Sequence, residues 1–146
     1  MSQTSSSTSE TIIEEITIKG SAERIFEALV DPKQRVQWWG QKGVYESTHV
    51  ESDTRVGGKW LMKGTGFSKE FIVHGEYRQV DRPRLLEFTW IPSWEEGSAE
   101  SVVRFELNEK AGVTSVRVTH SGLTPSGREA HKGWPRVLGW LRDYVE

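Results

Sequence analysis

The sequence predicts an α+β fold in which a curved antiparallel sheet of about seven strands wraps around a long C-terminal helix. Two observations carry this prediction. Apolar and polar residues alternate with a period of two from about residue 44 to residue 120, which is typical of half-buried strands joined by short turns. On either side of that stretch the apolar residues recur at helical spacing, which indicates two short helices before most of the sheet and one helix after it.

The first strand begins near Thr11, where isoleucines alternate with polar residues, and it ends at Gly20. Residues 1–10 are rich in serine and threonine, and we expect a disordered tail there. The tail has no apolar stretch behind a basic start, so it does not have the pattern of a signal peptide. One domain is expected over residues 11–146.

Two short helices are predicted to follow this strand. Ser21 is a suitable N-cap, and the apolar residues after it form one stripe that reaches Leu29. The pair Asp31-Pro32 closes this helix and opens the next one, because aspartate caps free N–H groups and proline lacks the N–H that stays unbonded at a first helical position. The second helix ends in the pair Trp38-Trp39.

Six further strands are predicted, with glycine or proline turns between them, and strands joined in this way form an antiparallel meander. They are expected at Val44–Glu51, Lys59–Lys63, Glu70–Val80, Leu85–Ile91, Ser101–Leu107 and Thr114–His120. Two of the turns are Gly64-Thr65-Gly66 and Asn108–Gly112. One face of this sheet is strongly aromatic, whereas residues such as Glu87, Thr89 and Arg117 are expected to point to water.

The last predicted element is an amphipathic helix between Thr124 and Glu146, with Trp134, Leu138 and Leu141 on its apolar stripe. A proline inside a helix costs about 3 kcal/mol or more, so Pro135 predicts either a kink or a helix that begins at Trp134. No other segment is large enough to cover the aromatic face of the sheet, and this helix is therefore expected to lie on it.

This order of elements describes a helix-grip architecture, and particular residues make it more specific. They are Ile16–Leu29, Asp31-Pro32 followed by Trp38-Trp39, Gly57-Gly58, Gly75-Glu76-Tyr77, Pro83–Trp90, and Gly133-Trp134 with Leu138 and Leu141. In these residues the chain resembles the START-like superfamily, and it is most similar to the branch named after the activator of the ATPase of the ninety-kilodalton heat-shock chaperone. The resemblance implies a hydrophobic cavity between sheet and last helix. Relatives hold lipids, sterols, plant hormones or polyketides there, and some cyclise or dehydrate them.

We therefore expect the protein to bind a small hydrophobic or amphipathic molecule in an internal cavity. The candidate wall residues are Trp38, Trp60, Phe71, Tyr77, Phe88, Trp90, Phe105, His120, Trp134 and Leu138. Aromatic rings of this bulk either line a cavity or interlock and fill it, and both interpretations stay open. Trp94, in the loop Pro92–Ala99, is a candidate lid residue.

Two alternatives belong to other functional classes. One is a chaperone cofactor or stress-response interaction module that works through its outer surface. The other is a cyclase, dehydratase or hydrolase acting on an aromatic or polyketide substrate. In that case His120 is the candidate acid or base, because the alternation of its strand turns it toward the aromatic face. The plainer interpretation is a core histidine paired with a neighbouring polar group.

The motifs and the composition argue against several classes of function and of protein. The four histidines fall on different elements without metal-ligand spacing, and no nucleotide-binding, phosphate-binding or hydrolase motif is present, so neither a metal nor a cofactor is predicted. The 19 basic and 21 acidic residues are scattered and sum to −2, which argues against nucleic-acid binding. The absence of cysteine excludes disulfides and is compatible with the expected cytoplasmic location. No apolar run approaches the roughly 20 residues of a membrane span.

Overall fold

The computed structural model describes residues 10–41, 45–66, 69–92, 100–125, 128 and 131–146. Among these residues, one antiparallel sheet contains eight strands in the order β1-β8-β7-β6-β5-β4-β3-β2. The strands are β1 Glu10–Lys19, β2 Gly40–Gln41, β3 Tyr45–Ser52, β4 Lys59–Gly66, β5 Lys69–Asp81, β6 Leu85–Pro92, β7 Ser101–Lys110 and β8 Val113–Leu123. The described helices are α1 Ala22–Val30, α2 Pro32–Trp38 and α4 Trp134–Val145.

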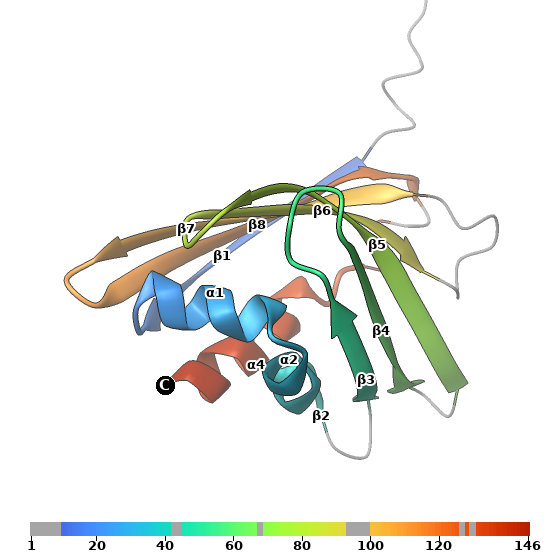
Figure 1. Cartoon of the computed structure of the whole chain (residues 1–146), viewed down its shortest axis with the longest axis horizontal. Helices are drawn as coiled ribbons and strands as arrows, with labels where there is room; N and C mark the ends of the chain where they lie inside the picture. Colours follow the sequence, from blue (N-terminus) through green and yellow to red (C-terminus); the bar gives the residue numbers. More distant parts are fainter. Residues whose placement is uncertain (1–9, 42–44, 67–68, 93–99, 126–127, 129–130) are drawn as a thin grey trace, which may run out of the picture.

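The sheet curves over the helices, and α1, α2 and α4 lie together on its concave side (Figure 1). The predicted α+β helix-grip fold is confirmed. The two-residue strand β2, which pairs with the start of β3, was not predicted. The first strand begins at Glu10, one residue before the expected start, and residues 1–9 and Trp94 lie outside the described residues.

The predicted helix caps are present. The side chain of Ser21 accepts a hydrogen bond from the N–H of Arg24 at 3.1 Å, and that of Asp31 accepts one from the N–H of Lys33 at 3.0 Å. Asp31 therefore ends α1 and caps α2, and Pro32 occupies the first position of α2, where its missing N–H costs nothing.

Helix α4 begins at Trp134, which decides between the two alternatives for Pro135. The proline occupies the second helical position, so no hydrogen bond is lost and no kink is required. Trp134, Leu138 and Leu141 are buried as the apolar stripe predicts, and the helix lies against β1 and α1. No helix in the described ranges has both the length and the apolar character needed to cross a membrane.

The predicted turn Gly64-Thr65-Gly66 is wrong, because β4 runs through it to Gly66. Gly64 lies directly opposite Phe71 on β5, and a Cβ atom at Gly64 would be 2.6 Å from Cζ of Phe71. The glycine thus provides room for an aromatic ring from the neighbouring strand, which is a second reason for glycine in a strand besides turn formation.

Two further predictions along the sheet need correction. The turn expected over Asn108–Gly112 is shorter, since β7 continues to Lys110 and only Ala111 and Gly112, both with positive φ, reverse the chain. Thr89, expected to point to water, is 6% exposed, and its hydroxyl accepts a hydrogen bond from the N–H of Glu76 at 2.8 Å.

Candidate functional site

An aromatic cluster occupies the core between the sheet and α4. Neighbouring ring centroids in it are 5.2–6.2 Å apart, a spacing at which aromatic pairs attract each other. We define the cluster as Trp39, Trp60, Phe88, Trp90, Phe105 and Trp134. All except Trp39 were predicted as wall residues. Because these rings contact one another, a molecule that enters here must displace at least one of them.

Trp60 spans three strands of the sheet. It lies on β4 directly opposite Gly75 of β5, and its indole N–H reaches over that glycine to donate to the carbonyl of Thr89 on β6, at 3.2 Å. A Cβ atom at position 75 would be 1.9 Å from the Thr89 oxygen and 2.7 Å from Nε1 of Trp60. Only glycine at this position allows the indole to lie in this way.

Two buried histidines lie beside the cluster and are held by its indoles. Trp134 donates from Nε1 to Nδ1 of His120 at 3.1 Å, and Trp90 donates from Nε1 to Nε2 of His131 at 3.0 Å. The two imidazole centroids are 4.9 Å apart. We call His120 and His131 the histidine pair; the sequence places them on separate elements, and the structure brings them together.

The indole of Trp134 fixes the protonation of His120, since an indole N–H can only donate. Nδ1 of His120 therefore carries no hydrogen, and the proton of the neutral ring lies on Nε2. That N–H donates to the hydroxyl of Ser101 at 2.7 Å, and the hydroxyl in turn donates to the carbonyl of Trp90 at 3.3 Å. A serine nucleophile needs a histidine that accepts its proton. In this arrangement His120 is the donor instead.

Burial, which disfavours the charged imidazole, and to a smaller extent the electrostatic influence of His131 lower the pKa of His120 to about 3. The imidazole is therefore neutral near pH 7, in agreement with its acceptor role toward Trp134. Both the hydrogen bonds and the pKa place His120 among satisfied core residues rather than among groups that exchange protons at neutral pH.

Arg35 is a buried cation next to the aromatic cluster. Its side chain comes from α2 and the residue is 3% exposed. The guanidinium carbon lies 4.6 Å from the ring centroid of Trp39, 4.9 Å from that of Trp60 and 6.0 Å from that of Phe88. These distances are typical of cation–π contacts.

Several of these residues were absent from the sequence prediction. Arg35 precedes Trp39 by four positions, the spacing at which helical side chains meet, and that was an available signal. Ser101 lies on the same face of β7 as the buried residues at every second position, so strand alternation also predicts that its side chain points inward. His131 lies in a turn ahead of α4, where no periodic signal applies.

The remaining predicted wall residues are buried but lie around the cluster rather than in it. Trp38 packs on Trp39 at 5.3 Å and donates to the carbonyl of Ala28 at 2.8 Å, so it joins α2 to α1. Tyr77 packs on Phe88 at 6.0 Å. The others are Phe71, which covers Gly64, and Leu138, on the buried stripe of α4.

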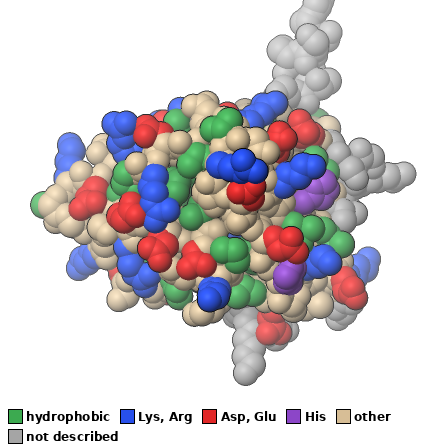
Figure 2. Space-filling model, in the orientation of Figure 1, with side chains coloured by type: hydrophobic (Ala, Val, Ile, Leu, Met, Phe, Trp, Pro, Cys, Tyr) green, Lys and Arg blue, Asp and Glu red, His purple; other side chains and the backbone are tan. Residues whose placement is uncertain are grey.

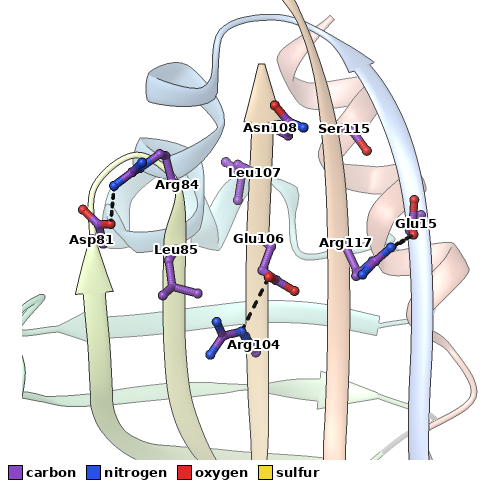
Figure 3. A pocket seen from close by; sticks show the side chains of 10 residues that line it. All are labelled: Glu15, Asp81, Arg84, Leu85, Arg104, Glu106, Leu107, Asn108, Ser115 and Arg117. Carbon is purple, nitrogen blue, oxygen red and sulfur yellow. Dashed lines mark hydrogen bonds and ion pairs between the residues drawn. The ribbon is translucent and has the colours of Figure 1, made fainter. Parts of the chain in front are cut away.

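The outer face of the sheet carries a separate pocket of about 430 Å³. Three ion pairs line it in Figure 3: Arg84 with Asp81 at 2.8 Å, Arg117 with Glu15 at 2.7 Å, and Arg104 with Glu106 at 3.8 Å. A second pocket, of about 500 Å³, lies beside the segment from Glu51 to Lys59. Neither pocket is lined by any of the ten predicted wall residues.

Charged side chains of both signs are interspersed over the face of the molecule shown in Figure 2. Within the described ranges, no three histidine, aspartate or glutamate side chains gather as a metal shell requires. The buried polar side chains that contact the aromatic cluster include those of the histidine pair, Ser101 and Arg35.

Comparison with known proteins agrees with this architecture. The family model described as Activator of Hsp90 ATPase homolog 1-like protein matches residues 19–146. The chain belongs to this family. No protein of curated function matches the chain in sequence.

Solved structures with the same fold include two bacterial proteins. A protein from Chromobacterium violaceum is 21% identical with a TM-score of 0.80, and the match covers 93% of this chain and 96% of that one. An AHSA1-like protein from Aeromonas hydrophila is 22% identical with a TM-score of 0.77, and the match covers 93% of this chain and 92% of that one. At these identities the similarity concerns the fold.

Proposed function

We propose that this protein binds a small amphipathic molecule in its interior, at the aromatic cluster between the sheet and α4. The observation that supports the proposal is the convergence of polar side chains inside an aromatic lining. Ser101 on β7, His120 on β8, His131 ahead of α4 and Arg35 on α2 all meet the cluster. Ligand sites combine mostly apolar walls with a few polar groups in this way.

The contacts of the cluster limit the size of the ligand. Since the rings lie 5.2–6.2 Å from their neighbours, a ligand enters by taking over the contacts of a displaced ring. A planar molecule about the size of an indole or a naphthalene satisfies this condition, with its apolar body among the indoles and its polar group toward the buried polar side chains.

A fluorescence titration tests the proposal. Naphthalene, indole, a medium-chain fatty acid and a sterol are added in turn while tryptophan emission is followed. We expect a saturable change with at least one planar compound. The variant Trp140→Phe is the control and should show the same saturable change. Trp140 is only partly buried on α4, and its loss leaves the aromatic cluster intact. No saturable response from any compound of the panel contradicts the proposal.

Native mass spectrometry of freshly purified protein gives an independent readout. A co-purifying mass of a few hundred daltons that disappears on unfolding supports interior binding and identifies the ligand class. The same variant, Trp140→Phe, should retain that mass.

A second candidate function is a protein-binding module, and the outer pocket of Figure 3 favours it. That pocket presents Arg84, Arg104 and Arg117 with their acidic partners on the outer face of the sheet, whereas the aromatic cluster lies on the inner face. The double variant Arg104→Glu and Arg117→Glu should weaken stimulation of a purified Hsp90-type ATPase if this face binds the chaperone. Unchanged stimulation by the double variant, or none by the parent, counts against this candidate.

A further inference from the structure

Arg35 is the one residue at the aromatic cluster, among the described residues, that carries a permanent charge. Its guanidinium stays protonated at any physiological pH, and it lies 3% exposed on the side of α2 that faces the sheet. Arginine is almost never buried to this degree unless its charge is paired, and at this position the rings of Trp39 and Trp60 contribute to its stabilisation. Hydrocarbon side chains fill such a position without the cost of removing a cation from water.

The geometry determines which part of Arg35 is available to a ligand. The rings of Trp39 and Trp60 lie 4.6 and 4.9 Å from the guanidinium carbon, within the range in which an aromatic face stabilises the cation. Such contacts leave the N–H groups, which lie in the guanidinium plane, to form hydrogen bonds. The group has five N–H donors in a fork that matches a carboxylate, so it can keep an existing partner and still bind an anion.

The indoles that hold Arg35 also provide the surface for an aromatic ring. Trp39 stacks on Trp90 with ring centroids 6.0 Å apart, and Trp60 packs against the same Trp90 at 5.5 Å. A ring that displaces one of these side chains comes to lie within reach of the guanidinium. An acid group attached directly to such a ring then meets the N–H fork of Arg35.

We propose that Arg35 recognises an anionic group on the ligand, and that the interior site is selective for planar aromatic carboxylates. This inference rests on the proposed function, since it requires that the interior binds a ligand. It assigns a role to α2: the helix brings the charge of Arg35 and the ring of Trp39 to one place, because the two residues are four positions apart.

The experiment compares two probes of nearly the same size and shape, the anion naphthalene-2-carboxylate and the neutral naphthalene-2-carboxamide, by calorimetric titration at one ionic strength. We expect the parent protein to bind the carboxylate about tenfold or more tightly, which is the effect of a charge-assisted hydrogen bond over a neutral one. Arg35→Met should lose this preference, and Arg35→Lys should keep part of it, since an ammonium retains the charge without the fork.

Arg24→Met is the matched control. Arg24 also lies over an aromatic ring, with its guanidinium carbon 5.2 Å from the centroid of Tyr144, but on the exposed side of α1. This variant should retain the full preference for the carboxylate. Thermal unfolding verifies that each variant is folded. If Arg35→Met does not fold, the Arg35 Nε–H resonance of the parent protein decides: the carboxylate should shift it and the carboxamide should not.

The outcomes separate this inference from the proposed function. Equal affinity of the parent protein for both probes overturns the role of Arg35 and leaves interior binding in place. The role of Arg35 is also overturned if Arg35→Met keeps the preference for the carboxylate. The same holds if the carboxylate does not shift the Arg35 Nε–H resonance of the parent protein. If the parent protein binds neither probe, the proposed ligand class is overturned. The wider fluorescence panel then decides whether the interior binds any ligand.

Discussion

The indole N–H of Trp134 donates to Nδ1 of His120 across 3.1 Å, and this single bond determines the tautomer of a fully buried imidazole. This bond joins α4 to β8, so it is one of the contacts that hold the last helix on the sheet. The position of α4 on the sheet and the tautomer of His120 therefore depend on each other.

The tautomer is directly measurable. At pH 7 the two-bond ¹H–¹⁵N spectrum of His120 should show a hydrogen on Nε2 and a bare Nδ1. Trp134→Phe removes the donor and leaves a buried acceptor unpaired, so the free energy of unfolding should fall by about 1–3 kcal/mol in addition to any packing loss. An imidazolium, or a hydrogen on Nδ1 in the parent protein, contradicts the hydrogen-bond assignment.

The low pKa of His120 predicts a loss of stability in acid. In the folded state the pKa is about 3, and in the unfolded chain it returns to 6.5. Between these pH values the unfolded state binds one more proton than the folded state. The contribution of neutral His120 to the free energy of unfolding is therefore complete above pH 6.5 and is lost as the pH falls toward 3. The slope is about 1.4 kcal/mol per pH unit at most.

Urea unfolding at pH 7, 6, 5 and 4 measures this slope. The variant His120→Gln should show a flatter profile than the parent protein, since glutamine does not titrate. His74→Gln, at an exposed position of β5, should follow the parent profile and so controls for the substitution itself. Parallel profiles for His120→Gln and the parent protein would refute the prediction.

Two glycines should respond to alanine in opposite ways. Gly75→Ala places a Cβ atom 1.9 Å from the carbonyl oxygen of Thr89, so we expect a loss of about 2 kcal/mol or more and a displaced Trp60 indole. Gly139→Ala on α4 meets nothing within 4 Å and should stabilise the protein by up to about 1 kcal/mol, because alanine favours helix. Chemical denaturation measures both, and equal effects of the two substitutions would show that the close contact at Gly75 is absent.

Arg82 should contribute little despite its several contacts. It pairs with Glu23 at 2.7 Å and with Glu27 at 3.9 Å, and its guanidinium lies 5.2 Å from the ring centroid of Phe26. Its side chain is 43% exposed, so water and salt screen these charges. Arg82→Met should cost less than about 1 kcal/mol, with a smaller cost in 1 M salt. A loss above 2 kcal/mol that is insensitive to salt would show that the contact is effectively buried.

The architecture was predictable from the sequence because it depends on local patterns. Strand alternation correctly turned Phe88, Trp90 and His120 inward, and the cap residues Ser21 and Asp31 marked the helix starts. The same alternation, applied to the first residue of β7, also indicates Ser101. Glycine was a poorer guide, since Gly64 makes room for a ring inside a strand instead of forming a turn.

The candidate site was only partly predictable. Its defining bonds join residues that are 14 and 41 positions apart, Trp134 with His120 and Trp90 with His131. These pairings depend on where α4 and the turn ahead of it rest on the sheet, and no periodicity encodes that placement. Arg35 was missed for a related reason, because a cation on a short helix is ordinarily a solvated side chain.

The close packing of the indoles has an optical consequence. Among the residues that the structure describes, Trp90 has three indole neighbours, Trp39, Trp60 and Trp134, with ring centroids 5.5–6.0 Å away. The strong far-ultraviolet transitions of chromophores this near couple to one another, so the far-ultraviolet circular dichroism should contain exciton bands that belong to the group and not to any single ring. Replacing Trp90 with phenylalanine should therefore remove more dichroic intensity than one residue accounts for.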